Sequence, residues 1–562
     1  MKLLMVISLI MVNMSLISCG NQPAAPSETD SLPSSNPFYA ESNLPFHAPD
    51  FNRIRDSDYK PALEAGMKQK LSEVRKIVDD PDSPSFENTI LPLEKAGALL
   101  TRTALVFNMV TGANTNPVLQ KLQEEIAPQL AANEDSIYLN SKLFERIETL
   151  YRQRDQLKLD SESLRLLEFY EQQFQMAGAN LREAGKEQLK RLNQEEASLS
   201  AQFTNRLLAA TQAGALVISD PAELKGLPAG TMDAAAQKAK ADHLDGKWVI
   251  ALQNTTQQPD LKFLADRDTR KKLFEASWNR AEKGDTNDTR ELVIKLAGLR
   301  AEKAKLLGFP SYAAWKLQDQ MAKNPEAVTG FLNKLVPAAT ARAREEAKDI
   351  QALIDQQKGG FSLQPYDWNF YADQVRKAKY DLDENQIKPY FELNTVLEKG
   401  VFYAAGLLYG LTFKPRTDIP VYQPDVKVYE VFDQDGKSLA LFYCDYFKRD
   451  NKSGGAWMDN AVYQSKLMGT KPVIFNVCNF SKPAPGQPAL ISFDDVTTMF
   501  HEFGHALHGM FANQQYQSLS GTNVARDFVE FPSQFNEHWA SDPKVFSHYA
   551  IHYQTGAPMP KA

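Results

Sequence analysis

Residues 492–511 have the sequence SFDDVTTMFHEFGHALHGMF, and this stretch decides the fold around it. Ser492 is suited to cap a helix, and Asp495 falls at the third helical position, so the two form a capping-box signal. Apolar residues then recur at helical spacing, at Val496, Met499, Phe500 and Phe503. The stretch therefore predicts an amphipathic helix with one face buried against the rest of the protein.

Two histidines on this helix, His501 and His505, are four residues apart. Positions i and i+4 lie on one helix face, about 5–6 Å apart at Cβ, so both imidazoles can bind one Zn²⁺. Glu502 is displaced by one residue, which places it beside the metal as a general base for the attacking water. Because His-Glu-x-x-His also occurs by chance on helix surfaces, the prediction depends on a third ligand.

An acidic third ligand is predicted after the helix. The histidine-containing extension of one large class would need Gly at position 508 and His at 511, but the chain has His508 and Phe511. Residues 506–526 contain no Asp or Glu, and the first carboxylates afterwards are Asp527 and Glu530. The surrounding Phe and Val residues predict a second buried helix that brings Glu530 to the metal. Three protein ligands leave one coordination place open, as in catalytic zinc sites.

Further polar side chains near the predicted ligands need a role. A histidine that binds a metal usually passes its other N–H to a carboxylate or carbonyl group. Asp527 and Glu537 are the candidates for that contact, and for Asp527 a solvent-exposed carboxylate is the alternative. His508 is expected to pack or to contact substrate, and no role is assigned to His538, His548 or His552.

The remainder of the chain predicts a mostly α-helical protein with a small sheet. Residues 58–211 and 260–355 have helical periodicity, and the stripe of Leu189, Leu192, Leu199 and Phe203 predicts helix packing. The segment 426–445 alternates around Asp435-Gly436, which indicates a β-hairpin, and a further short strand is expected at 473–477. We expect an N-terminal helical region at 44–250 and a catalytic region at 251–562.

Length and composition set outer limits. A chain of 562 residues with 43% hydrophobic and 24% charged residues can bury a large core and form two to four lobes. The net charge of −7 is mild and the charges are interspersed, so the sequence offers no basic block to bind nucleic acid.

The N-terminus predicts export. Residues 1–18 have the short apolar core of a signal peptide, and they end in Leu-Ile-Ser before Cys19, as in a bacterial lipoprotein whose cysteine is lipidated. An ordinary signal peptide with an incidental cysteine is the alternative. Residues 19–43 are expected to be a flexible tether, and the protein is expected to be lipid-anchored in the bacterial cell envelope. Cys444 and Cys478 are predicted to be buried free thiols, with one disulfide as the alternative.

The run from His501 to Trp539 closely resembles the M3 family of thimet-type oligopeptidases, as do residues 445–458 and 300–313. This resemblance implies a two-lobed, mostly helical fold with a deep channel that admits only short, unstructured peptides. It also implies one zinc ion on His501, His505 and Glu530, with Glu502 as the base. The hairpin would offer a strand edge along which an extended peptide could lie.

The resemblance also leaves alternatives open. It is strongest to bacterial peptidyl-dipeptidases, which implies release of C-terminal dipeptides by a single chain. An endo-acting oligopeptidase of the same family is the alternative. Family members continue well beyond the position of Ala562, in a part that holds Tyr and His residues for substrate. We therefore expect a C-terminally truncated chain, for which a non-catalytic peptide-binding lipoprotein is a further alternative.

Overall fold

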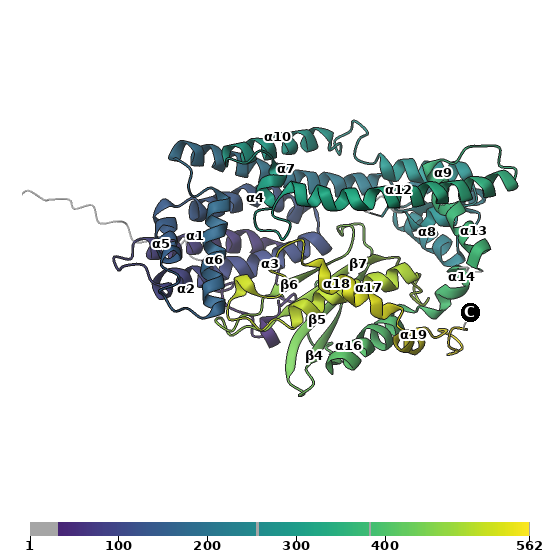
Figure 1. Cartoon of the computed structure of the whole chain (residues 1–562). Coiled ribbons are helices and arrows are strands. Elements are labelled where there is room, and N and C mark those ends of the chain that lie inside the picture. Colours follow the sequence, from purple (N-terminus) through teal and green to yellow (C-terminus); the bar gives the residue numbers. More distant parts are fainter. Residues whose placement is uncertain (1–31, 254–257, 381–383, 561–562) are drawn as a thin grey trace, which may run out of the picture.

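The computed structural model describes residues 32–253, 258–380 and 384–560, and helices dominate it (Figure 1). Ser492, Asn116 and Asp160 each begin a helix by accepting backbone N–H groups with their side chains, which satisfies donors that a helix start leaves open. The N-terminal helices are α1 (Asp56–Val78), α2 (Leu91–Lys95), α3 (Ala98–Ala113), α4 (Pro117–Tyr138), α5 (Ser141–Arg152), α6 (Ser161–Ala177) and α7 (Glu183–Ala213).

The N-terminal helices share two apolar cores. One core gathers Tyr59, Leu63 and Phe107 from α1 and α3, and the other includes Leu167 and Phe174 from α6. These α6 residues lie within residues 58–211, for which the sequence predicted helical structure. The mostly α-helical class is thereby confirmed for this part of the chain.

Residues 32–43 differ from the predicted flexible tether. Leu32 and Phe38 are buried in the core that Tyr59 joins, and the Arg102 guanidinium of α3 donates to the carbonyl oxygen of Phe38. Two apolar side chains supplied enough burial to fix a segment whose composition is otherwise polar. The first 31 residues, with the predicted signal peptide and Cys19, lie outside the described residues.

The middle of the chain forms long helices along one side of the molecule (Figure 1). Leu192 and Leu199 of α7 pack against Leu292 and Leu296 of α10, as the leucine stripe predicted. Helix α10 ends before Gly308, whose φ of 85° lies in the left-handed region that favours glycine. The elements of this part are β1 (Leu216–Ile218), α8 (Ala229–Ala241), β2 (Trp248–Ile250), α9 (Arg267–Trp278), α10 (Arg290–Leu306), α11 (Tyr312–Lys316), α12 (Pro325–Gln356), α13 (Trp368–Tyr380), α14 (Glu384–Ile387), α15 (Leu393–Val396) and α16 (Phe402–Tyr409).

A five-stranded sheet precedes the motif helix in the chain, in the order β3-β4-β5-β7-β6. Its strands are β3 (Thr412–Pro415), β4 (Lys427–Phe432), β5 (Ser438–Phe447), β6 (Trp457–Val462) and β7 (Val473–Phe480). The predicted hairpin is β4–β5 with Gly436 at positive φ in its turn, and the predicted strand at 473–477 is part of β7. The hairpin offers no free edge, because β3 and β7 flank it; the edge strands are β3 and β6.

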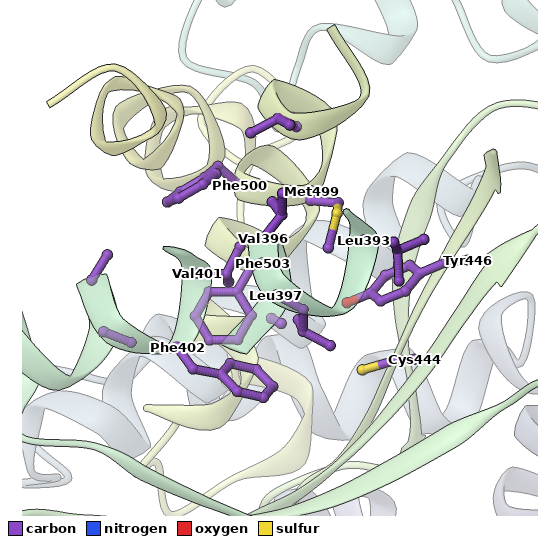
Figure 2. Packing of buried hydrophobic residues seen from close by; sticks show 14 of the residues in the cluster. Leu393, Val396, Leu397, Val401, Phe402, Cys444, Tyr446, Met499, Phe500 and Phe503 are labelled. Carbon is purple, nitrogen blue, oxygen red and sulfur yellow. The ribbon is translucent and has the colours of Figure 1, made fainter. Parts of the chain in front are cut away.

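The main core lies between this sheet and α17 (Phe493–Met510). Phe500 and Phe503 of α17 share this core with Val396 and Phe402 of the preceding helices and with Cys444 of β5 (Figure 2). The ring centroids of Phe402 and Phe503 lie 5.9 Å apart. Cys444 and Cys478 are buried free thiols, as predicted. The last helices are α18 (Glu530–Glu537) and α19 (Pro543–Tyr549). The sheet and its aromatic core thus form a rigid base for the helix that carries His501.

Candidate metal centre

The motif helix α17 forms where the sequence predicted it. Ser492 accepts the N–H of Asp495 at 3.1 Å, and the Asp495 carboxylate accepts the N–H of Ser492 at 3.0 Å, which completes the capping box. The face of Val496 and Phe503 is buried, so His501 and His505 are turned towards the opposite, accessible side. The apolar stripe therefore fixes the direction of the imidazoles.

Helix α18 crosses α17 at Gly504, at very close range. A Cβ at Gly504 would lie 2.7 Å from Cα of Ser533 and 2.9 Å from the carbonyl oxygen of Pro532. Beside this crossing, the Asn536 side chain donates to the carbonyl oxygen of Phe500 at 2.6 Å. The absence of a side chain at Gly504 lets the two helices approach closely enough for their polar faces to meet.

Three side chains converge between the two helices. Oε2 of Glu530 lies 3.2 Å from Nε2 of His501 and 3.2 Å from Nε2 of His505. One ligand atom from each residue lies within 4.8 Å of the other two. Two imidazole nitrogens and a carboxylate oxygen are the donor set that zinc takes in three-ligand catalytic sites.

The hydrogen bond on the far side of His501 makes this donor set suitable for a cation. Nδ1 of His501 lies 2.6 Å from Oε1 of Glu537, so Nδ1–H donates a hydrogen bond to the carboxylate. In the neutral ring Nε2 is then an acceptor, and it faces the acceptor oxygen of Glu530. Two lone pairs at this distance repel each other unless a proton or a metal ion lies between them, and the second imidazole nitrogen directed at the same oxygen makes the three residues fit a metal ion.

Glu502 has the environment of an acid–base group. Glu502 is only 4% exposed, and its Oε2 atom is buried without a hydrogen-bond partner in the described part of the chain. Burial, and secondarily the charge of Glu530, raises the pKa of Glu502 to about 8. A carboxyl group that gains a proton this readily, next to metal-ligand atoms, is suited to move one in a reaction.

Asp527 has no hydrogen bond to His501 or His505 among the described residues. Its carboxylate accepts the backbone N–H groups of Met321 and Ala322, each at 2.9 Å. Of the two candidates for holding a histidine, the structure brings only Glu537 to the site, because Asp527 lies in a turn before α18 rather than on the helix.

The second helix departs from the expectation of a buried segment. It begins at Glu530 itself, and Phe528, Phe531 and Phe535 are exposed, with their rings in contact along one side. The aromatic residues predicted burial, but α18 is buried only along the face that contacts α17.

His508 lines a pocket of about 410 Å³ with Phe531 and Phe535, on the side of Gly504. Burial lowers the pKa of His508, and its Nδ1 has no partner among the described residues. The expectation of packing or substrate contact is compatible with this position.

His548, to which the sequence assigned no role, stacks on Tyr403, and its Nδ1 lies 2.6 Å from the carbonyl oxygen of Lys399.

The sequence reasoning missed Gly504 and Asn536, which set the crossing of α17 and α18. Gly504 occupies a variable position of the His-Glu-x-x-His pattern, where the motif itself makes no demand. A glycine in the middle of a helix lowers helix stability by about 0.5–1 kcal/mol relative to alanine. The presence of a glycine at this unfavourable position was the sequence feature that could have indicated a close helix contact.

The fold, and a helical His-Glu-x-x-His motif with a glutamate carboxylate beside it, are those of a metal-dependent hydrolase. Comparison with known proteins identifies the family. Residues 261–562 match the family model of peptidase family M3, and the chain belongs to that family. It is a metallopeptidase, so the predicted family, fold class and peptide-hydrolysing activity are confirmed.

Among the relatives are bacterial peptidases that align over most of the chain. Dipeptidyl carboxypeptidase from Escherichia coli is 56% identical over 93% of this chain and 77% of its own length. The enzyme of the same name from Salmonella typhimurium is 55% identical over 94% and 78%, respectively. Oligopeptidase A from Escherichia coli is 30% identical over 92% and 77%.

The predicted lipid-anchored location in the cell envelope is wrong. It rested on residues 1–19 alone, and the close similarity to the two dipeptidyl carboxypeptidases contradicts it. Among the helices that the structure describes, none is long and apolar enough to cross a membrane.

Proposed function

We propose that the chain binds one zinc ion through Nε2 of His501, Nε2 of His505 and Oε2 of Glu530. Membership of family M3 supports a metal-dependent peptidase, and the converging donor set is the observation that carries the choice of residues. Two imidazoles and one carboxylate favour zinc over the hard cations Mg²⁺ and Ca²⁺, which prefer oxygen ligands. A bound zinc ion supplies a Lewis acid and lowers the pKa of the attacking water.

The protein residues then handle orientation and the proton. Glu537 holds the His501 ring by its Nδ1–H, which leaves Nε2 free to be a ligand. Glu502 takes the proton of the attacking water and returns it to the leaving amine of the peptide. Its pKa, raised to about 8 by burial before any metal is considered, favours this return because the protonated form is accessible near neutral pH.

We further propose that the enzyme releases dipeptides from the C-terminal end of short peptides. High identity to dipeptidyl carboxypeptidases supports this specificity, whereas the 30% identity to oligopeptidase A supports the endo-acting alternative less well. We propose that it acts as a monomer. The family match at 261–562 supports the division into an N-terminal helical region and a catalytic region.

A matched pair of peptides tests the specificity. One unstructured peptide is offered as the free acid and as its C-terminal amide, and the products are identified by mass spectrometry over time. We expect sequential loss of dipeptides from the free acid and much slower cleavage of the amide, because the terminal carboxylate is then no longer available for recognition. Equal internal cleavage of both peptides would instead establish an endo-acting oligopeptidase.

A further inference from the structure

Residues 511–529, which we term the ligand linker, join the helix of His501 and His505 directly to Glu530, the first residue of α18. Its regular structure is a single 3-10 turn, Gln517–Leu519. The linker forms several short-range turns of its own, and contacts with other parts of the molecule direct its course, among them the backbone N–H groups of Lys466 and Leu467, which donate to the carbonyl oxygens of Gln514 and Gln515 at 3.1 and 2.9 Å. The Glu530 carboxylate accepts the hydroxyl of Ser533 on its own helix at 2.9 Å. Because Glu530 is the first residue of α18 and its side chain is 53% exposed, the linker contacts also contribute to the position of this carboxylate.

Two carboxylates of the N-terminal helices hold the first half of the linker. Glu162 at the start of α6 accepts the backbone N–H groups of Gln515 at 2.5 Å and Tyr516 at 3.3 Å. Glu94 of α2 accepts both the N–H and the hydroxyl of Ser518, at 2.9 and 2.7 Å. Hydrogen bonds to an ionised acceptor are stronger than those between neutral groups, so these contacts fix the linker backbone well.

A buried aromatic ring adds to this attachment. Tyr516 is 4% exposed and belongs to the apolar core of α5 and α6, with its ring centroid 6.2 Å from that of Phe86. Its hydroxyl lies 2.7 Å from the hydroxyl of Ser163, the neighbour of Glu162. The connection between two predicted metal ligands is therefore inserted into a core that lies far from them in the sequence.

Asp527 holds the other half. Its two carboxylate oxygens accept the N–H groups of Met321 and Ala322, each at 2.9 Å, just before α12 begins. In return the Gln320 side chain accepts the N–H of Asp527 at 3.3 Å. Val524 and Phe528 on either side are exposed, so apolar burial contributes little to fixing this half.

We propose that Glu162 and Asp527 are positioning residues for the metal centre. They fix the two halves of the ligand linker, and through it they hold the Glu530 carboxylate opposite the two imidazoles. This inference rests on the proposed function, because it requires Glu530 to be a ligand. Metal ligands must lie within about 0.2 Å of ideal distances, so a linker that shifts or fluctuates weakens binding of the ion.

Alanine variants of the two residues test the inference in the full chain. The zinc affinity of Glu162→Ala and of Asp527→Ala is measured by competition with a chelator, together with kcat, KM and the unfolding midpoint. We expect zinc binding about 10–100-fold weaker in each variant, the range for groups that orient metal ligands. Glu162→Gln should bind zinc more tightly than Glu162→Ala, because an amide oxygen can accept the same two N–H groups.

Glu73→Ala is the matched control. Glu73 also accepts a backbone N–H, that of Gly97 at 2.7 Å, but this contact lies wholly within the N-terminal helices. The control should lower the unfolding midpoint and leave zinc affinity unchanged. Unchanged zinc affinity in both test variants would overturn the inference, as would an equal loss in Glu73→Ala. If Glu162→Ala fails to fold, Asp527→Ala decides the question alone.

His505→Ala separates this inference from the proposed function. Zinc binding that His505→Ala abolishes, but that tolerates Glu162→Ala and Asp527→Ala, would leave the metal site standing and remove the positioning role alone. Zinc binding that is absent from the unaltered protein, or unaffected by His505→Ala, would remove the metal site itself and with it the basis of the inference.

Discussion

At the scale of single residues, the site depends on how few partners its polar atoms have. Glu537 accepts a hydrogen bond from Nδ1–H of His501, which places the lone pair of the neutral ring on Nε2, opposite the oxygen of Glu530. Glu502 has a buried oxygen without a hydrogen-bond partner in the described residues. Uncompensated polar atoms of this kind are costly in a folded protein, so their concentration at one place indicates a site built for an ion and for proton transfer.

Replacing Glu502 should remove catalysis and spare metal binding. Glu502→Gln keeps the shape of the side chain but cannot accept a proton, so kcat on a quenched peptide should fall by about 10²–10⁴-fold. Zinc content should stay at the level of the unaltered protein, because Glu502 is not a proposed ligand. Full activity of the variant would show that another group acts as the base.

The same residue predicts a pH dependence of stability after zinc is removed with a chelator. The folded pKa of Glu502, about 8, lies above its unfolded value of about 4.5. The folded state therefore binds more protons between these values, and stability falls as pH rises through that window. Glu502→Gln lacks this loss. We expect its unfolding midpoint to exceed that of the unaltered protein increasingly from pH 5 to pH 8, and parallel pH profiles would contradict the pKa shift.

At the scale of elements, the site is a helix crossing supported by a sheet. Helix α17 rests on the aromatic core over the five-stranded sheet, so its polar face is held in a fixed direction. Helix α18 meets that face where Gly504 allows close approach. The distance between the histidines and Glu530 is therefore a property of two packed helices, and the ligand linker sets where the second one begins.

Gly504→Ala should separate the two helices. The added methyl would lie 2.7 Å from Cα of Ser533 and 2.9 Å from the carbonyl oxygen of Pro532, and since these two are backbone atoms, the helices must move. Overpacking of this kind costs about 1–3 kcal/mol, and zinc affinity should fall as well. Gly298→Ala in α10 is the control, because its added methyl meets open space and should stabilise the helix by up to about 1 kcal/mol. Equal effects of the two changes would contradict a close crossing.

At the scale of the whole molecule, the N-terminal helices and the catalytic sheet are joined by buried polar groups. Asp445 of β5 is fully buried and pairs with Arg449 through both carboxylate oxygens. It also accepts from Lys452 and from the Tyr422 hydroxyl. Arg449 then donates to the carbonyl oxygen of Ala113 at the end of α3, so one buried network links the two parts.

Asp445→Ala should destabilise the whole protein strongly. It leaves the charges of Arg449 and Lys452 in the interior without their shared carboxylate, and loss of one partner of a buried pair costs about 3–5 kcal/mol. Glu346→Ala removes an exposed ion pair with Arg342 on α12 and should cost less than about 1 kcal/mol. Denaturant unfolding measures both, and a similar small loss for Asp445→Ala would contradict the importance of the network.

Much of the fold could be predicted from the sequence because local signals were strong. The capping box at Ser492, the leucine stripe of α7 and the turn at Asp435-Gly436 are each decided by neighbouring residues, and each was confirmed. Long-range features were not accessible in this way. The flanking of the hairpin by β3 and β7, the burial of Phe38 and the exposure of Phe531 depend on partners distant in the sequence.

The candidate site divides in the same manner. The sequence alone showed the spacing of His501 and His505, and it showed that residues 506–526 contain no carboxylate. The sequence did not show that Glu537 contacts His501 and that Asp527 does not. That difference depends on where α18 begins, because only Glu537 lies on the same helix as Glu530. The predicted lipid anchor was drawn from a short apolar N-terminus, a signal that carries no information about the remaining chain.

The central claim is that one metal ion is held by His501, His505 and Glu530, and that Glu502 acts beside it without binding it. Metal analysis of the purified chain by mass spectrometry, with Glu502→Gln and His505→Ala in parallel, tests this most directly. The account predicts one zinc per chain in the unaltered protein and in Glu502→Gln, and almost none in His505→Ala. Full zinc content in His505→Ala, or loss of zinc in Glu502→Gln, would contradict it.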